Sequence, residues 1–349
     1  MEVAPLEGPR HHDHEWLGFS VERICRKAQT VSGRPAPVSV FLCLARGPGE
    51  GSTSVMEFFR PSTWADALAI KAGQPGARAI AGGTDVMVEI NFDRSRPEAL
   101  LDLTGVADLA EWSADGPVIR LGAGVPYTRV IAELGGRLPG LAMASRTVGS
   151  PQIRNRGTVG GNLGSASPAG DAHPPLLADD TVVEAASVRG TRDIPIREFF
   201  TGVKRSALAP DELIAAVRVP VADGPQQFSK VGVRNAMVIA VSSFAIALHP
   251  DRGRVGTGFG SAAPTPRPAA AAEEFLAAEL ADRGLWESRG PLPEPAMRRF
   301  GELVAEAAAP IDDVRGTAAY RRHSLAVMAR RTLAWAWQSY REEEQQRCA

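Results

Sequence analysis

From residue 56 onward, the spacing of hydrophobic and polar positions predicts helices and strands that alternate along the chain. Thr63–Lys71 is predicted as a short helix with Ser62 or Thr63 as its cap, and Ala77–Ala81 as a strand that leads into a glycine-rich loop. The alternation continues with a helical turn over Val86–Asn91, strands over Ala99–Asp102 and Val118–Gly122, a helix over Thr128–Leu134, a helix start over Pro174–Ala178, and strands over Val182–Ala185, Arg192–Pro195 and Glu212–Val219. This pattern predicts a first folded region that ends near residue 222.

After residue 222 the pattern changes to consecutive strands followed by helices. The predicted strands are Phe228–Val233, Val238–Leu248 and Val255–Ser261, with a turn at Pro250–Gly253, and the predicted helices are Ala269–Ala281, Gly301–Ala309 and Ser324–Tyr340. The stretch Gly284–Pro295 is rich in Pro and Gly and is predicted as a surface connection. Strands followed by helices are typical of a separate α+β domain, here over residues 223–340, with 341–349 as a tail.

Residues 1–55 differ from the rest of the chain. They contain the cluster His11-His12-Asp13-His14 and a Gly-, Pro- and Ser-rich run from Gly47 to Ser54, before the pattern begins at Met56. We expect a disordered extension or a start-site artefact with Met56 as the natural first residue. A metal site on the histidine cluster is the alternative, although adjacent residues cannot all point at one ion.

Composition and charge exclude several classes of protein. The 349 residues, 44% of them apolar, suffice for two or three domains with a sizeable core, and a net charge of −1 provides no general attraction for nucleic acid or an anionic membrane. The longest apolar stretches, Val38–Ala45 and Ala236–Leu248, are too short to span a bilayer. Cys25, Cys43 and Cys348 form neither a disulfide framework nor a metal-binding motif, so we expect a cytoplasmic protein.

Two glycine-rich loops are the main candidates for chemistry. Ala81–Asp85 joins a predicted strand to a predicted helix, where backbone amides attract an anion such as a diphosphate, although a purely structural turn explains this loop equally well. Thr158–Asn162 is followed by several short polar residues, among them Ser165 and Asp171, which exceeds what a ligand-free turn requires. Neither loop matches a Rossmann or Walker motif. Together they predict a dinucleotide held from two sides.

Other polar residues give weaker indications. Lys230 on a predicted strand is either a cation beside a cofactor or a solvated charge, and His173 is either a proton-transfer group or, more commonly for a lone loop histidine, a plain polar contact. Asp312-Asp313 is expected to pair with Arg315 rather than to bind a metal. Trp335 and Trp337 are expected to pack against other side chains. No catalytic residue and no metal ligand is therefore assigned.

Six segments in order carry a resemblance to a known family: Phe58-x-Arg60-Pro61, Ala81–Asp85, Ile153–Asn162, Ala166–Pro174, Gly260–Pro266 and Asp312–Arg322. From Met56 to about Tyr340 the chain resembles the FAD-binding medium subunit of the molybdenum hydroxylases, the family of xanthine dehydrogenase and carbon monoxide dehydrogenase. No cysteine lies between Arg46 and Arg347, so the branch of this family with an extra iron–sulfur loop is disfavoured.

The resemblance implies an α+β fold: a two-lobed FAD-binding domain of the vanillyl-alcohol oxidase type, with a small lobe over about 56–110 and a larger lobe over about 111–222, followed by a C-terminal domain of antiparallel sheet and helices. It implies that Val148 falls where some relatives place an aromatic side chain against the flavin ring. The implied FAD-binding residues are Ala79, Ile80, Ala81, Gly82, Gly83, Thr84, Asp85 and Val86 in the diphosphate loop, Thr158, Gly161, Asn162 and Asp171 in the second cradle, and Ile214 and Lys230 beside the flavin.

The resemblance also implies an electron-transfer role. Partner subunits would supply a molybdenum cofactor and iron–sulfur clusters, and FAD on this chain would pass the electrons to NAD or another acceptor. A stand-alone flavin oxidase is the alternative, for which His173 is the one candidate proton acceptor that the sequence offers. A scaffold that has lost its flavin is a third reading, weakened because both glycine loops are intact.

Overall fold

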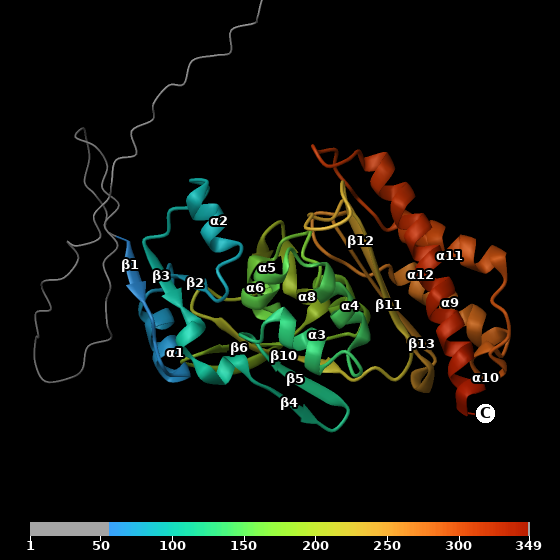
Figure 1. Cartoon of the computed structure of the whole chain (residues 1–349), viewed down its shortest axis with the longest axis horizontal. Coiled ribbons are helices and arrows are strands. Elements are labelled where there is room, and N and C mark those ends of the chain that lie inside the picture. Colours follow the sequence, from blue (N-terminus) through green and yellow to red (C-terminus); the bar gives the residue numbers. More distant parts are fainter. Residues whose placement is uncertain (1–55, 348–349) are drawn as a thin grey trace, which may run out of the picture. The chain divides into compact units, whose positions relative to one another are not determined.

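The computed structural model describes residues 56–347, and describes side chains as far as Glu342. The predictions for residues 1–55, including the histidine cluster, and for the last two residues lie outside the described part. The described elements form a mixture of helices, one parallel sheet and several antiparallel sheets, so the prediction of an α+β chain is confirmed (Figure 1).

The chain begins with a small three-stranded parallel sheet in the order β1 (Glu57–Phe59), β3 (Ala99–Asp102), β2 (Arg78–Ile80). Between β1 and β2 lies α1 (Trp64–Gly73), whose N-cap Thr63 accepts a hydrogen bond from the Asp66 amide at 3.1 Å. The short helix α2 (Val86–Asn91) follows the first glycine loop. The strand–loop–helix arrangement predicted around that loop is therefore confirmed.

A five-stranded antiparallel sheet follows, in the order β4 (Trp112–Asp115), β5 (Val118–Gly122), β10 (Leu213–Pro220), β6 (Val182–Ser187), β7 (Gly190–Pro195). Strand β10 is central and almost wholly buried, as its apolar sequence requires. The helices are α3 (Tyr127–Glu133), α4 (Pro139–Thr147), α5 (Pro151–Arg156), α6 (Val159–Ser165), α7 (His173–Ala178) and α8 (Ile196–Phe199), and a two-stranded ribbon pairs β8 (Phe200–Gly202) with β9 (Arg205–Ser206). Helices α3 to α6 lie on one side of the five-stranded sheet (Figure 1).

A third sheet consists of β11 (Gln226–Val231), β12 (Ser242–His249) and β13 (Arg254–Gly260), all antiparallel. Helices α9 (Ala270–Asp282), α10 (Leu285–Ser288), α11 (Glu294–Glu306) and α12 (Ala318–Arg347) enclose a second hydrophobic core with it, in which Phe244 and Phe300 meet edge to face. Gly256 allows β13 to approach α7 closely, because a Cβ atom there would lie 1.9 Å from the Ala178 carbonyl oxygen.

Several predicted boundaries need correction. Strand β12 begins at Ser242 rather than Val238, since residues 238–241 form the end of a loop in which the Val241 amide donates to the Val231 carbonyl. Helix α11 begins seven residues before the predicted Gly301, with a proline in its first turn, and the predicted connection Gly284–Pro295 contains α10. Strand β4 and helices α4 and α5 were not predicted at all. Among the described helices, none has both the length and the apolar character needed to cross a membrane.

Candidate functional site

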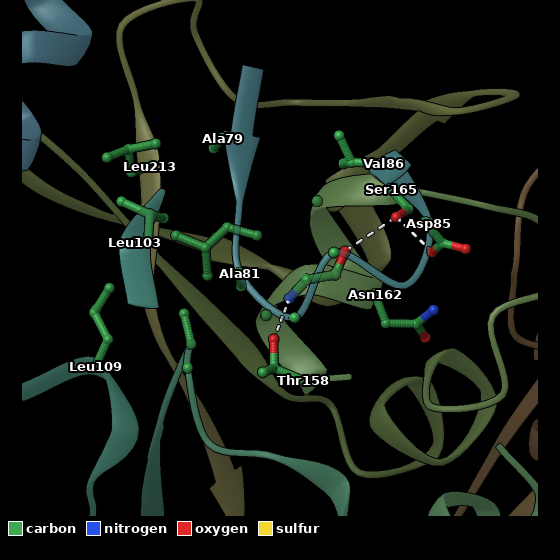
Figure 2. A pocket seen from close by; sticks show the side chains of 18 of the residues that line it. Ala79, Ala81, Asp85, Val86, Leu103, Leu109, Thr158, Asn162, Ser165 and Leu213 are labelled. Atoms are coloured by element: carbon green, nitrogen blue, oxygen red, sulfur yellow. Dashed lines mark hydrogen bonds between the residues drawn. The ribbon is translucent and has the colours of Figure 1, made fainter. Parts of the chain in front are cut away.

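A pocket of about 630 Å³ lies where the two glycine-rich loops meet. Its lining comes from five segments of the chain: residues 71–86, 103–110, 123–127, 148–165 and 206–214. Figure 2 shows Ala81 and Asp85 from the first loop beside Thr158, Asn162 and Ser165 from the second. The two loops, about eighty residues apart in sequence, therefore lie side by side in the lining of one pocket.

The first loop contacts the second through its backbone. A Cβ atom at Gly82 would lie 1.9 Å from the carbonyl oxygen of Arg156, so only glycine fits at this contact. Gly83 adopts a positive φ of 76°, in the left-handed region that glycine tolerates best. Beyond the glycines, the Ser165 hydroxyl donates to Asp85 Oδ2 at 2.8 Å (Figure 2). The two glycines of the first loop are thus required, Gly82 by its contact with the chain just before the second loop and Gly83 by its backbone conformation.

The second loop forms the first turn of α6. Thr158 is the N-cap, and its Oγ1 accepts a hydrogen bond from the Gly161 amide at 2.9 Å. The amides of this turn carry a partial positive charge, which favours an anionic ligand. Two buried oxygens in the pocket lining, Asn162 Oδ1 and the Tyr127 hydroxyl, find no hydrogen-bond partner among the described residues. Because buried polar atoms are normally satisfied, both fit a site built for a polar ligand.

The charged residues of the lining differ in whether they are free to bind a ligand. Lys71 Nζ donates to the carbonyls of Pro75 and Ala77, at 2.7 Å each, and burial lowers its pKa. Glu212 pairs with Arg192 at 2.7 Å, and this hydrogen bond lowers the pKa of the carboxyl. Arg156 is exposed at the pocket. Lys71 and Glu212 therefore serve mainly the protein itself. Backbone amides remain as groups able to receive a diphosphate, together with two cations of the lining, Arg156 and Arg78, the latter 3.5 Å from Glu89.

Most of the residues expected to bind FAD line this pocket. They are Ala79, Ala81, Gly82, Gly83, Thr84, Asp85, Val86, Thr158, Gly161, Asn162 and Ile214. Ile80, Asp171 and Lys230 do not belong to the lining. Their contact with a cofactor stays a prediction.

Asp171 and Lys230 instead bind each other. Lys230 Nζ lies 2.5 Å from Asp171 Oδ2, and both side chains are only 8% exposed. Burial raises the pKa of Asp171, while the charge of Lys230 and the hydrogen bonds from Lys230 and Thr147 oppose that rise. Since Lys230 belongs to β11 and Asp171 follows the second glycine loop, this ion pair joins the third sheet to the edge of the site.

His173 is buried away from the pocket. It is fully covered, packs against the Phe200 ring with centroids 4.7 Å apart, and has Nε2 3.2 Å from the Asn162 carbonyl oxygen. Burial lowers its pKa to about 4, so the imidazole is neutral near pH 7. The residue therefore makes a plain polar contact, the more common of the two roles expected for it.

The predictions for Asp313 and for the two tryptophans of the last helix have different outcomes. Asp313 pairs with Arg315 at 2.6 Å, as expected, and also with the buried Arg321 at 2.5 Å, and these partners hold its pKa far below the usual range. Trp337 packs against Trp286, but Trp335 is 51% exposed, so the prediction of packing is wrong for Trp335. No group of three potential metal ligands occurs in residues 56–347.

Sequence reasoning missed a large part of the lining. The missed residues include Leu103, Thr104, Val106, Leu109, Ala123, Gly124, Tyr127, Asn155, Arg156, Gly164, Leu208 and Leu213. Asn155 and Arg156 precede the second loop and fall within Ile153–Asn162, one of the segments that carry the family resemblance, and this was the signal for them. The apolar members look like ordinary core residues in sequence, because a pocket wall and a protein core use the same side chains.

The fold and the site define a protein that holds a nucleotide cofactor between two glycine loops. Residues 54–222 match the family described as FAD binding domain in molybdopterin dehydrogenase, and residues 227–336 match the CO dehydrogenase flavoprotein C-terminal domain. The chain belongs to the family of FAD-binding medium subunits of the molybdenum hydroxylases. Its cofactor is FAD, and it is an oxidoreductase subunit.

Individual relatives agree with this assignment. The chain is 30% identical to the xanthine dehydrogenase FAD-binding subunit of Escherichia coli O157:H7, over 80% of this chain and 95% of the relative. It is 28% identical to the carbon monoxide dehydrogenase medium chain of Afipia carboxidovorans, over 79% of this chain and 95% of the relative. A crystal structure of the cyanide-inactivated Cu,Mo-CO dehydrogenase superimposes with a TM-score of 0.74 at 28% identity, covering 81% of this chain and 98% of that chain.

Proposed function

We propose that this chain is the electron-transfer subunit of a cytoplasmic molybdenum hydroxylase complex. It would receive electrons from iron–sulfur clusters on a small partner subunit, while a large partner subunit with a molybdenum cofactor oxidises the substrate. It would pass the electrons to NAD or another acceptor. FAD supplies the chemistry when bound, because a flavin accepts electrons singly and releases them as a pair.

In this proposal the FAD-binding domain, 56–222, has the two lobes of the vanillyl-alcohol oxidase type. The small lobe, about 56–110, contains the parallel sheet, and the larger lobe, about 111–222, contains the five-stranded sheet. The C-terminal domain, 223–340, contacts the FAD-binding domain through the ion pair between Lys230 and Asp171, and residues 341–349 form a tail. The pocket between the first glycine loop and the second supports this division.

Different residues of the pocket would bind different parts of FAD. Amides of the two glycine loops and Arg156 would hold the diphosphate, and Asn162 Oδ1 and the Tyr127 hydroxyl would satisfy polar groups of the cofactor. Ile214 and Val148, both in the lining, would contact the apolar face of the flavin ring. The observation that carries the proposal is the one pocket that both glycine loops line, with Gly82 packed against the carbonyl of Arg156 just before the second loop.

The alternative of a stand-alone flavin oxidase requires a proton acceptor beside the cofactor. His173, the candidate from sequence, is fully buried and does not line the pocket. Of the lining carboxylates, Glu212 is held by Arg192 and Asp85 accepts a hydrogen bond from Ser165. Because both carboxylates already have partners, they argue against a free proton acceptor beside the cofactor in the described part of the chain. This favours the electron-transfer role.

The test is to purify the full chain, record its absorbance spectrum, and identify any chromophore released by heat. We expect the bands of an oxidised flavin and release of FAD. A colourless protein that also fails to take up added FAD would contradict the assignment of the pocket. Co-purification of tagged chain with its neighbours from the native host then tests the partner subunits, and a chain that oxidises small substrates when alone would favour the stand-alone oxidase.

A further inference from the structure

The turn between α4 and α5 carries Val148 into the pocket lining. The turn consists of Val148, Gly149 and Ser150, directly after Thr147 at the end of α4, and Gly149 adopts a positive φ of 44°. A Cβ atom at Gly149 would lie 2.8 Å from the Ile153 side chain, so the turn is closely packed against α5. A small, tightly packed turn has few ways to adjust when a polar contact is lost.

Three successive carbonyl oxygens, those of Thr147 at the end of α4 and of Val148 and Gly149 in the turn, accept hydrogen bonds from cationic side chains. Arg154 Nη1 donates to the carbonyl of Val148 at 3.1 Å and to that of Gly149 at 3.0 Å. Lys230 Nζ donates to the carbonyl of Thr147 at 3.1 Å. Hydrogen bonds from charged donors are stronger than those between neutral groups, so the orientation of three successive peptide units is set by two side chains.

The two cations reach the turn from different parts of the fold. Arg154 belongs to α5, which directly precedes the second glycine loop, and Lys230 belongs to β11 in the third sheet. Lys230 is held in place by Asp171, whose Oδ2 also accepts from the Thr147 hydroxyl at 3.2 Å. With its carbonyls bound to these cations, the turn presents the Val148 side chain to the pocket.

We propose that Arg154 is a positioning residue of the cofactor site. By binding the carbonyls of Val148 and Gly149 it fixes the turn, so that Val148 forms the wall that covers one face of the bound flavin ring. This inference rests on the proposed placement of the ring beside Val148 and Ile214. Arg154 acts through the turn and need not touch the cofactor.

The test compares variants of the full chain by FAD titration and by quenching of the bound flavin's fluorescence with iodide. Arg154→Met keeps an unbranched apolar stem and removes both hydrogen bonds. We expect it to bind FAD about tenfold more weakly, a loss of about 1.4 kcal/mol, because the turn is no longer fixed, and to leave the flavin more accessible to iodide. Arg154→Lys, which retains a charged donor, should restore part of both properties.

Two further variants make the result decisive. Val148→Ala removes the wall itself and leaves the carbonyls that Arg154 binds, so it should raise iodide quenching even if Arg154→Met does not fold. Gln152→Ala, an exposed position on the same helix, should behave like the unchanged protein. Unchanged iodide quenching in Val148→Ala, or in a folded Arg154→Met variant, would overturn the proposal. Failure of the unchanged protein to bind FAD would instead count against the proposed site as a whole.

Discussion

Single residues in this chain have roles that depend on what surrounds them in the fold. Lys230 and Asp171 were expected beside a cofactor, yet in the structure each is the other's partner at 2.5 Å. His173 was a candidate for proton transfer, and it is instead a buried contact to the Asn162 carbonyl. A charged or titratable side chain in a buried setting is stable only with a partner or in its neutral form, and this requirement explains both outcomes.

The buried His173 predicts a specific dependence of stability on pH. Its pKa is lowered from 6.5 to about 4 in the folded state, so the unfolded chain binds the proton more readily between these values. The stabilisation is therefore complete above pH 6.5 and is lost as the pH falls toward 4, by up to about 3 kcal/mol in the free energy of unfolding. Glutamine does not titrate but keeps an N–H donor. The free energy of unfolding of His173→Gln, measured with denaturant at several pH values, should therefore fall less between pH 6.5 and pH 4 than that of the unchanged protein.

The matched control for that experiment is His323→Gln, since His323 is exposed on α12. Its stability curve should run parallel to that of the unchanged protein. The pKa of His249 is also lowered by burial, but this contribution is common to all three proteins and cancels in the comparison. Parallel curves for His173→Gln and the unchanged protein would show that His173 does not carry the effect.

At the scale of elements, the glycine loops hold the site together because they touch each other. The first loop ends β2 and begins α2, while the second begins α6, and the contact between Gly82 and Arg156 occurs between backbones. A backbone carbonyl that clashes with an added atom cannot change its position as easily as a flexible side chain can. The two loops therefore tolerate no added atom at this contact.

Gly82→Ala should separate the two loops. We expect the free energy of unfolding to fall by about 2 kcal/mol, as is usual for overpacking, and FAD binding to weaken at least about tenfold, because both walls of the pocket shift. Thermal unfolding and FAD titration measure the two effects. Gly76→Ala is the control, since a Cβ atom there meets nothing within 4 Å. Equal behaviour of the two variants would contradict the importance of the contact.

The elements were largely predictable where the local pattern is strong. The strand Ala99–Asp102 and the helix Val86–Asn91 have the bounds that the sequence predicts, and the cap at Thr63 is confirmed. Helices α4 and α5 were missed, although each begins with a proline at its first position. Both are short, and short helices gain their stability from packing more than from local propensity.

For the whole molecule, a few buried polar side chains connect the third sheet to the cofactor-binding region. Gln226 opens β11 and is 4% exposed. Its Nε2 donates to Asp179 Oδ1 at 2.7 Å, and its Oε1 accepts from the Gly140 amide in the first turn of α4 at 2.8 Å. One side chain thus satisfies groups from two helices, and it lies between the ranges that match the two family models.

Gln226→Leu should weaken this connection. The substitution leaves a buried amide and a buried carboxyl without their partner, which costs about 2 kcal/mol. We expect a lower midpoint of urea unfolding, measured by fluorescence, than for Gln227→Leu. That control makes the same change at the next residue of β11, where the side chain is half-buried. If Gln227→Leu lowers the midpoint as much, the loss cannot be assigned to the hydrogen bonds of Gln226.

The sequence by itself determined the α+β class, the family and the FAD cofactor. Of the fourteen residues that it predicted to bind FAD, eleven line one pocket in the structure. It could do so because the glycine loops need particular residues at particular positions in a short stretch of chain. Only the tertiary structure decided that Gly82 packs on Arg156, that Lys230 binds Asp171, and that two cations hold the Val148 turn. Most of these contacts join residues about sixty to eighty positions apart, and no local pattern of hydrophobic and polar residues encodes which distant groups meet.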